Sequence, residues 1–146
     1  MSPDGDPSGS LRFELGQIRK ELSVLNRMLG KKRRLGRDEV QIRAAASSLQ
    51  SIYNGIEKML AIELRKGQSV GSGPTSHSDL LDEALSSGIT SPDLNNSLRD
   101  LMGFRHFYRH SYGFMIDNEQ MNPILEKVED IVESLAKELN VESGGG

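Results

Sequence analysis

Apolar residues recur every three or four positions along most of the chain, which is the spacing of an amphipathic helix. The first stripe consists of Leu11, Leu15, Ile18, Leu22, Leu25 and Leu29. Gly30 follows this stripe and is well placed to end the helix. A second, longer stripe predicts a helix over about residues 38–66, which Gly67 ends.

The second half of the chain predicts three more helices. A short one carries Leu80, Leu81, Ala84 and Leu85. The pair Ser91–Pro92 is typical of an N-cap followed by proline at the first helical position, and it precedes Leu94, Leu98 and Leu101. The pair Asn122–Pro123 repeats this signal and predicts the start of the last helix.

These stripes predict an all-α fold, an up-and-down helical bundle of four main helices plus one short helix. The length of 146 residues fits a single domain, expected over residues 11–140. Flexible tails are expected over residues 1–10 and 141–146, and residues 67–76 (GQSVGSGPTS) form the main internal loop. His77, beside this Ser/Gly-rich loop, is expected to stand alone and face solvent.

The composition indicates a cytoplasmic protein. Cysteine is absent, which excludes disulfides and thiolate metal sites and gives no sign of an oxidising compartment. The first ten residues, MSPDGDPSGS, lack the basic and apolar regions of a signal peptide. No apolar run approaches the roughly 20 residues that span a bilayer.

Charge is spread unevenly along the chain. The net charge is −3, so binding to nucleic acid would require a local basic patch. Residues 31–43 hold six lysines and arginines against Asp38 and Glu39, a local charge of +4. Residues 117–142 hold eight acidic side chains against two lysines, a local charge of −6. The basic run is either a surface that attracts polyanions or a solvated connection between helices.

Residues 104–112, FRHFYRHSY, gather two of the three histidines and two of the three tyrosines. Arg105 occupies the position after Leu101 on the apolar stripe, where a charge must be paired or reach water. His110 lies five residues later, about 140° around a continuous helix. The two side chains therefore converge only if the helix ends or bends near residues 108–110, or if a second subunit supplies one of them.

Two interpretations of this segment remain open from its residues. Cationic side chains stabilise the C-terminal end of a helix, so Arg105 and His110 could serve as a cap. Alternatively, a histidine that transfers protons and an arginine that binds phosphate together suffice to cleave RNA without a metal. The chain carries neither a GxxxxGK[ST] phosphate loop nor an HExxH zinc motif.

The segment also resembles a known family pattern. Arg105, four residues, His110, one residue and Tyr112 fill the R-x4-H-x-Y form of the HepT-like toxins, a branch of the HEPN ribonuclease superfamily. The preceding residues 98–105 (LRDLMGFR) are similar to that family as well. The residue after the arginine is often asparagine there; here it is His106, so either His106 or His110 could be the main proton-transfer group.

The resemblance implies a metal-independent ribonuclease toxin with an all-helical bundle fold and no cofactor, acting on cellular RNA such as tRNA or mRNA. Arg105 would stabilise the scissile phosphate, and His110 would act as general base or acid. Tyr112 would be adenylylated by a minimal nucleotidyltransferase antitoxin. Supporting residues would be His106, Tyr108 and Arg109, and RNA-binding residues would be Lys31, Lys32, Arg33, Arg34 and Arg37.

Family members are typically homodimers whose two motifs face one cleft, and a larger toxin–antitoxin complex is compatible with this. A homodimer would also bring Arg105 of one subunit near His110 of the other. The alternative function is a non-catalytic helical module, in which the same residues bind a nucleotide, an anion or a partner.

Overall fold

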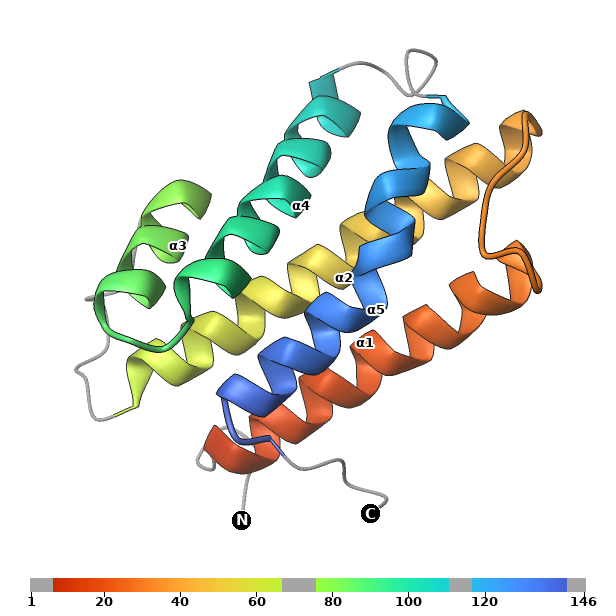
Figure 1. Ribbon diagram of the computed structural model, residues 1–146. Helices are drawn as coiled ribbons and strands as arrows, with labels where there is room; N and C mark the ends of the chain where they lie inside the picture. Colours follow the sequence, from red (N-terminus) through yellow and green to blue (C-terminus); the bar gives the residue numbers. More distant parts are fainter. Residues whose placement is uncertain (1–6, 67–75, 111–116, 142–146) are drawn as a thin grey trace.

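Five helices make up the protein in the computed structural model, which describes residues 7–66, 76–110 and 117–141 (Figure 1). Their bounds are α1 (Pro7–Leu29), α2 (Glu39–Arg65), α3 (His77–Ser86), α4 (Pro92–His110) and α5 (Asn118–Glu138). No strand occurs within these ranges. The predicted all-α bundle of four main helices and one short helix is therefore confirmed.

The helices pack around one apolar core. Figure 1 shows α1 and α2 running antiparallel, with α5 and α4 also aligned along the bundle and the short α3 beside α4. Every helix contributes fully buried side chains to this core, among them Leu15, Ile52, Leu81, Leu98 and Leu135. The stripes read from the sequence are thus the faces that the helices bury against one another, except that Leu85 of the predicted α3 stripe is exposed.

Local signals set several of the helix ends. The Asp38 carboxylate accepts hydrogen bonds from the N–H groups of Val40 and Gln41, which caps α2. Gly30, with φ of 72°, follows α1 in the left-handed conformation that glycine adopts without steric cost. Ser91 caps α4 by accepting from the N–H of Leu94 at 3.1 Å, as its sequence predicts.

The ends of the bundle extend further than the sequence predicts. Helix α1 begins at Pro7, so the expected tail over residues 1–10 is wrong for residues 7–10; proline is well suited to a first helical position. At the other end, Val141 packs against the core and donates its N–H to the Ala136 carbonyl at 2.9 Å. Val141 therefore belongs to the domain rather than to the tail.

The predicted start of the last helix is also wrong. Helix α5 begins at Asn118, and Asp117 and Gln120 form a capping box around its first turn. Pro123 lies inside the helix, in its second turn, where the missing N–H removes one intrahelical hydrogen bond. The side chain of Asn122 is buried and binds the backbone of Leu35 instead of capping a helix.

Helices α1 and α2 approach each other closely at Gly55. A Cβ atom on Gly55 would lie 2.6 Å from Cγ1 of Ile18, a distance that real side chains do not tolerate. This contact holds α2 against α1. The neighbouring residue, Asn54, is half-buried.

Among the described residues, no helix is both long enough and apolar enough to cross a membrane.

Candidate functional site

The apolar stripe of helix α4 is followed by a charged residue, Arg105. The buried apolar residues of α4 are Leu94, Leu98 and Leu101, followed by Phe104. Arg105 takes the next position and is half-buried. A guanidinium therefore lies at the edge of the core, where an ordinary bundle would place an apolar side chain.

Arg105 is held by groups from two other helices. Its Nε donates to Oδ1 of Asn54 on α2 at 3.1 Å, and its Nη1 lies 3.2 Å from Nε2 of His77 on α3. His77 in turn hydrogen-bonds through Nδ1 to the Glu57 carboxylate on α2. Arg105 is thus hydrogen-bonded at the edge of the core, and no ion pair to it occurs among the described residues. Only two of its five N–H groups are engaged in the described part of the chain, and N–H groups of a guanidinium can bind the oxygens of an anion.

Tyr53 lies beside this hydrogen-bonded group. Its side chain is buried, and its hydroxyl has no hydrogen-bond partner among the described residues. Burial, together with the nearby Glu57 carboxylate, raises the pKa of Tyr53 far above its usual value, against the weaker opposing effect of Arg105. Tyr53 therefore remains a neutral phenol and does not act as a base.

The structure corrects the expectation for His77. It is the first residue of α3, and Ser76 caps that helix by accepting from the N–H of Asp79 at 3.1 Å. His77 is partly exposed but is bonded to both Glu57 and Arg105, so it does not stand alone in solvent. The spacing of Ser76 and Asp79 is the signal that could have placed a helix start here.

Asn54 and Glu57 were not singled out from the sequence either. They lie three residues apart on α2 and hence on the same side of it. That spacing alone does not distinguish them from ordinary surface residues. Only the packing of α3 and α4 on this side of α2 gives them partners.

The structure describes the other residues of the R-x4-H-x-Y segment only in part. Helix α4 continues to His110, its last residue, so the helix does not end between Arg105 and His110, and on a regular helix the two positions lie about 140° apart around the axis. His106 is exposed on α4. The side chains of Tyr108, Arg109 and His110, and the whole of Tyr112, lie outside the described part of the chain.

A family model described as "HepT-like protein" matches residues 44–141, a span that takes in most of α2 and all of α3, α4 and α5. The chain belongs to the HepT-like family. No curated protein and no solved structure matches it. The matched span of this HepT-like protein contains Arg105, its two partners Asn54 and His77, and Glu57, which bonds to His77.

The basic cluster of this HepT-like protein, Lys31, Lys32, Arg33, Arg34 and Arg37, is exposed on the connection between α1 and α2. Arg33 forms an ion pair with Glu129 at 2.9 Å, and Arg34 lies 3.7 Å from Glu126. The other three make no ion pair within the described ranges. Carboxylates of α5 thus neutralise part of the positive charge of the basic cluster.

The connection lies at the end of the bundle where α5 begins. The Leu35 backbone binds the side chains of Asn118 and Asn122, which belong to the first two turns of α5. Helix α4 ends at His110, only a few residues before α5 starts at Asn118. The basic cluster and the C-terminal end of the motif helix therefore lie at the same end of the molecule (Figure 1).

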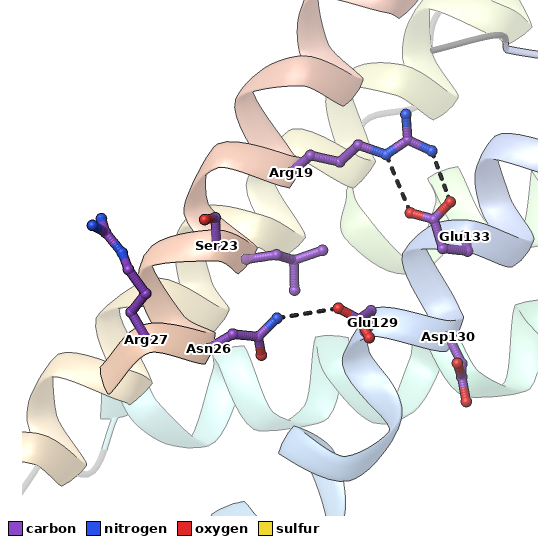
Figure 2. A pocket seen from close by; sticks show the side chains of 8 residues that line it. Arg19, Ser23, Asn26, Arg27, Glu129, Asp130 and Glu133 are labelled. Atoms are coloured by element: carbon purple, nitrogen blue, oxygen red, sulfur yellow. Dashed lines mark hydrogen bonds and ion pairs between the residues drawn. The ribbon is translucent and has the colours of Figure 1, made fainter. Parts of the chain in front are cut away.

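A groove between α1 and α5 is a weaker candidate site (Figure 2). The Arg19 guanidinium donates to both oxygens of Glu133, at 2.7 and 3.2 Å, and Asn26 donates to Glu129 at 3.1 Å. These polar groups satisfy one another across the groove, which ties the two helices together. Among the described residues, no group of three or more His, Asp or Glu side chains is arranged to hold a metal ion.

Proposed function

We propose that this HepT-like protein is a metal-independent ribonuclease toxin that cleaves cellular RNA, with tRNA or mRNA as its substrate class. The observation that carries the proposal is the placement of Arg105 at the edge of the core. Its guanidinium is oriented by Asn54 and His77, and three of its N–H groups have no partner among the described residues, so they can bind an anion. A helix cap would need no such support from two other helices.

The reaction uses the 2′-hydroxyl of RNA as the nucleophile. A base takes the 2′-hydroxyl proton, the 2′-oxygen forms a bond to its own phosphorus, and the bond from phosphorus to the 5′-oxygen breaks. An acid returns a proton to that 5′-oxygen. Arg105 stabilises the charge that develops on the phosphate oxygens, and His110 transfers a proton, with His106 as the second available imidazole.

The proposal includes a homodimer. Helix α4 is continuous from Arg105 to His110, so the two residues point in different directions from one helix. In a homodimer, Arg105 of one subunit and His110 of the other can bind the same phosphate. Supporting roles fall to Tyr108 and Arg109 on the same segment.

Regulation by a nucleotidyltransferase antitoxin completes the proposal. Transfer of AMP to Tyr112, seven positions after Arg105, would add bulk and a negative phosphate near the guanidinium. The added group would exclude RNA both sterically and electrostatically. Co-expression with the antitoxin should give a mass gain of one or more AMP units, which Tyr112→Phe removes.

Cleavage of labelled RNA by the purified protein in EDTA tests the ribonuclease proposal. His110→Ala should lower the rate by roughly 10²–10⁴-fold, the range for loss of a general acid or base. Arg105→Ala should lower it by about 10²–10³-fold, because a charge-stabilising donor is lost. Arg12→Ala, at an exposed arginine of α1, is the matched control and should leave the rate unchanged.

An oligonucleotide with one 2′-deoxy position at the cleaved linkage should resist cleavage. If the wild-type protein binds RNA but does not cleave it, the non-catalytic binding module replaces the ribonuclease proposal. Cleavage that disappears in EDTA would indicate a metal-dependent reaction.

A further inference from the structure

Glu57, His77, Arg105 and Asn54 form one unbroken hydrogen-bonded chain across α2, α3 and α4. Only Arg105 belongs to the R-x4-H-x-Y segment. His77 lies 28 positions before it and Asn54 lies 51 positions before it. The arginine of the motif therefore depends for its orientation on residues that the motif does not contain.

The donors and acceptors in this chain assign the tautomer of His77. A guanidinium can only donate, so Nε2 of His77 must accept from Arg105 and carries no hydrogen. The ring hydrogen is then on Nδ1, where it is donated to the Glu57 carboxylate. In this tautomer one ring nitrogen of His77 is bonded to a carboxylate and the other to a guanidinium.

The imidazole also keeps Glu57 apart from the arginine. A carboxylate bonded directly to Arg105 would occupy the same N–H groups that a phosphate needs and would compete with it. His77 accepts one hydrogen without placing a negative charge there. Only 13% of the Glu57 side chain is exposed, against 48% of His77, so the more buried carboxylate restrains the orientation of the ring.

We propose that His77 is a positioning residue of the site: oriented by Glu57, it holds the Arg105 guanidinium together with Asn54, so that the free N–H groups are preorganised for an RNA phosphate. The proposal rests on the proposed ribonuclease function. Without His77, Asn54 would be the one described residue that restrains the guanidinium, through Nε. Preorganisation matters because a displacement of about 1 Å in a positioned group can cost roughly a hundredfold in rate.

Two substitutions of His77 test this role in the RNA cleavage assay. His77→Ala removes the acceptor and should lower kcat/KM by roughly a hundredfold. His77→Gln offers an amide oxygen to Arg105 but does not transfer protons, and it should retain activity within about tenfold of wild type. Equal loss in both variants would overturn the positioning role, because it would indicate proton transfer by His77. Wild-type activity in His77→Ala would also overturn it.

Ser76→Ala serves as the matched control for the integrity of α3. It removes the N-cap of α3 but leaves His77 in place. We expect cleavage by this variant to stay near wild type. A loss equal to that of His77→Ala would show that the helix, rather than the bond to Arg105, carries the effect.

A binding measurement separates this inference from the ribonuclease proposal. Affinity for a 2′-deoxy-substituted oligonucleotide, measured by fluorescence anisotropy, should fall in His77→Ala and recover in His77→Gln even if the wild-type protein cleaves nothing. The ¹⁵N spectrum of the imidazole should show the Nδ1–H tautomer in wild type, and this preference should weaken in Arg105→Ala. Unchanged affinity in His77→Ala, or an Nε2–H tautomer in wild type, would overturn the inference whatever the catalytic result.

Discussion

The Asn122 side chain binds both backbone groups of Leu35: Oδ1 accepts the N–H at 2.8 Å, and Nδ2 donates to the carbonyl at 3.2 Å. Both residues are buried. The contact joins the start of α5 to the connection between α1 and α2. It therefore fixes the buried part of the segment that carries the basic cluster.

Asn122→Ala should lower the free energy of unfolding by about 1–3 kcal/mol, because it leaves the buried N–H of Leu35 without a partner. Urea unfolding followed by circular dichroism measures the change. Asn118→Ala is the matched control: Asn118 also donates to the Leu35 carbonyl, at 3.3 Å, but that carbonyl keeps Asn122 as a donor. The control should cost less than about 1 kcal/mol. Equal losses would contradict this account.

The close approach of α1 and α2 gives a second prediction. Gly55→Ala places a methyl group 2.6 Å from Cγ1 and 3.0 Å from Cδ1 of buried Ile18. Overpacking costs about 1–3 kcal/mol, against a gain of about 0.5–1 kcal/mol in helix propensity, so we expect net destabilisation of about 1–2 kcal/mol.

Gly16→Ala is the control for this substitution, since a Cβ at exposed Gly16 meets nothing within 4 Å. That variant should be stabilised by about 0.5–1 kcal/mol. Thermal unfolding of both variants distinguishes the effects. Stabilisation of Gly55→Ala would show that α1 and α2 separate easily at this point.

The sequence predicts the bundle because each helix must bury its apolar stripe, and these stripes follow the period of a helix. It misplaces the start of α5, since Asn122–Pro123 has the form of a cap while Asn122 instead binds Leu35 from inside the helix. The position of Arg105 on the stripe indicates that the charge either has partners or reaches water. Their identity, Asn54 and His77, depends on how α2, α3 and α4 pack, which no local pattern encodes.

Tyr53 should make stability depend on pH in the alkaline range. Burial and Glu57 raise the pKa of Tyr53 in the folded protein, whereas in the unfolded chain a tyrosine ionises near pH 10. Above about pH 10 the folded state therefore binds more protons than the unfolded state, and stability falls as pH rises.

Tyr53→Phe removes this contribution. Between pH 10 and 11 its free energy of unfolding should fall by about 1 kcal/mol less than that of wild type, as measured by urea unfolding. At pH 7 the two proteins should differ by less than about 1 kcal/mol, because the hydroxyl has no hydrogen-bond partner among the described residues. Parallel pH profiles would show that the phenol ionises as readily in the folded protein.

The basic cluster should bind RNA mainly through Lys31, Lys32 and Arg37. These three make no ion pair in the described part of the chain, whereas Arg33 and Arg34 lie against α5 carboxylates. Release of counterions from single-stranded RNA gives a slope of about −0.7 per neutralised phosphate in a plot of log affinity against log salt. Replacing the three by alanine should therefore make that slope shallower by about 2.

Arg33→Ala/Arg34→Ala is the comparison variant and should change the slope by less than about 1, because α5 carboxylates already neutralise part of its charge. Lys20→Ala/Lys58→Ala, at exposed lysines on α1 and α2, controls for the loss of positive charge alone. Anisotropy with the 2′-deoxy-substituted oligonucleotide across a salt series gives all the slopes. If the triple variant keeps the wild-type slope, RNA does not cross this end of the bundle, and the basic run is a solvated connection between helices.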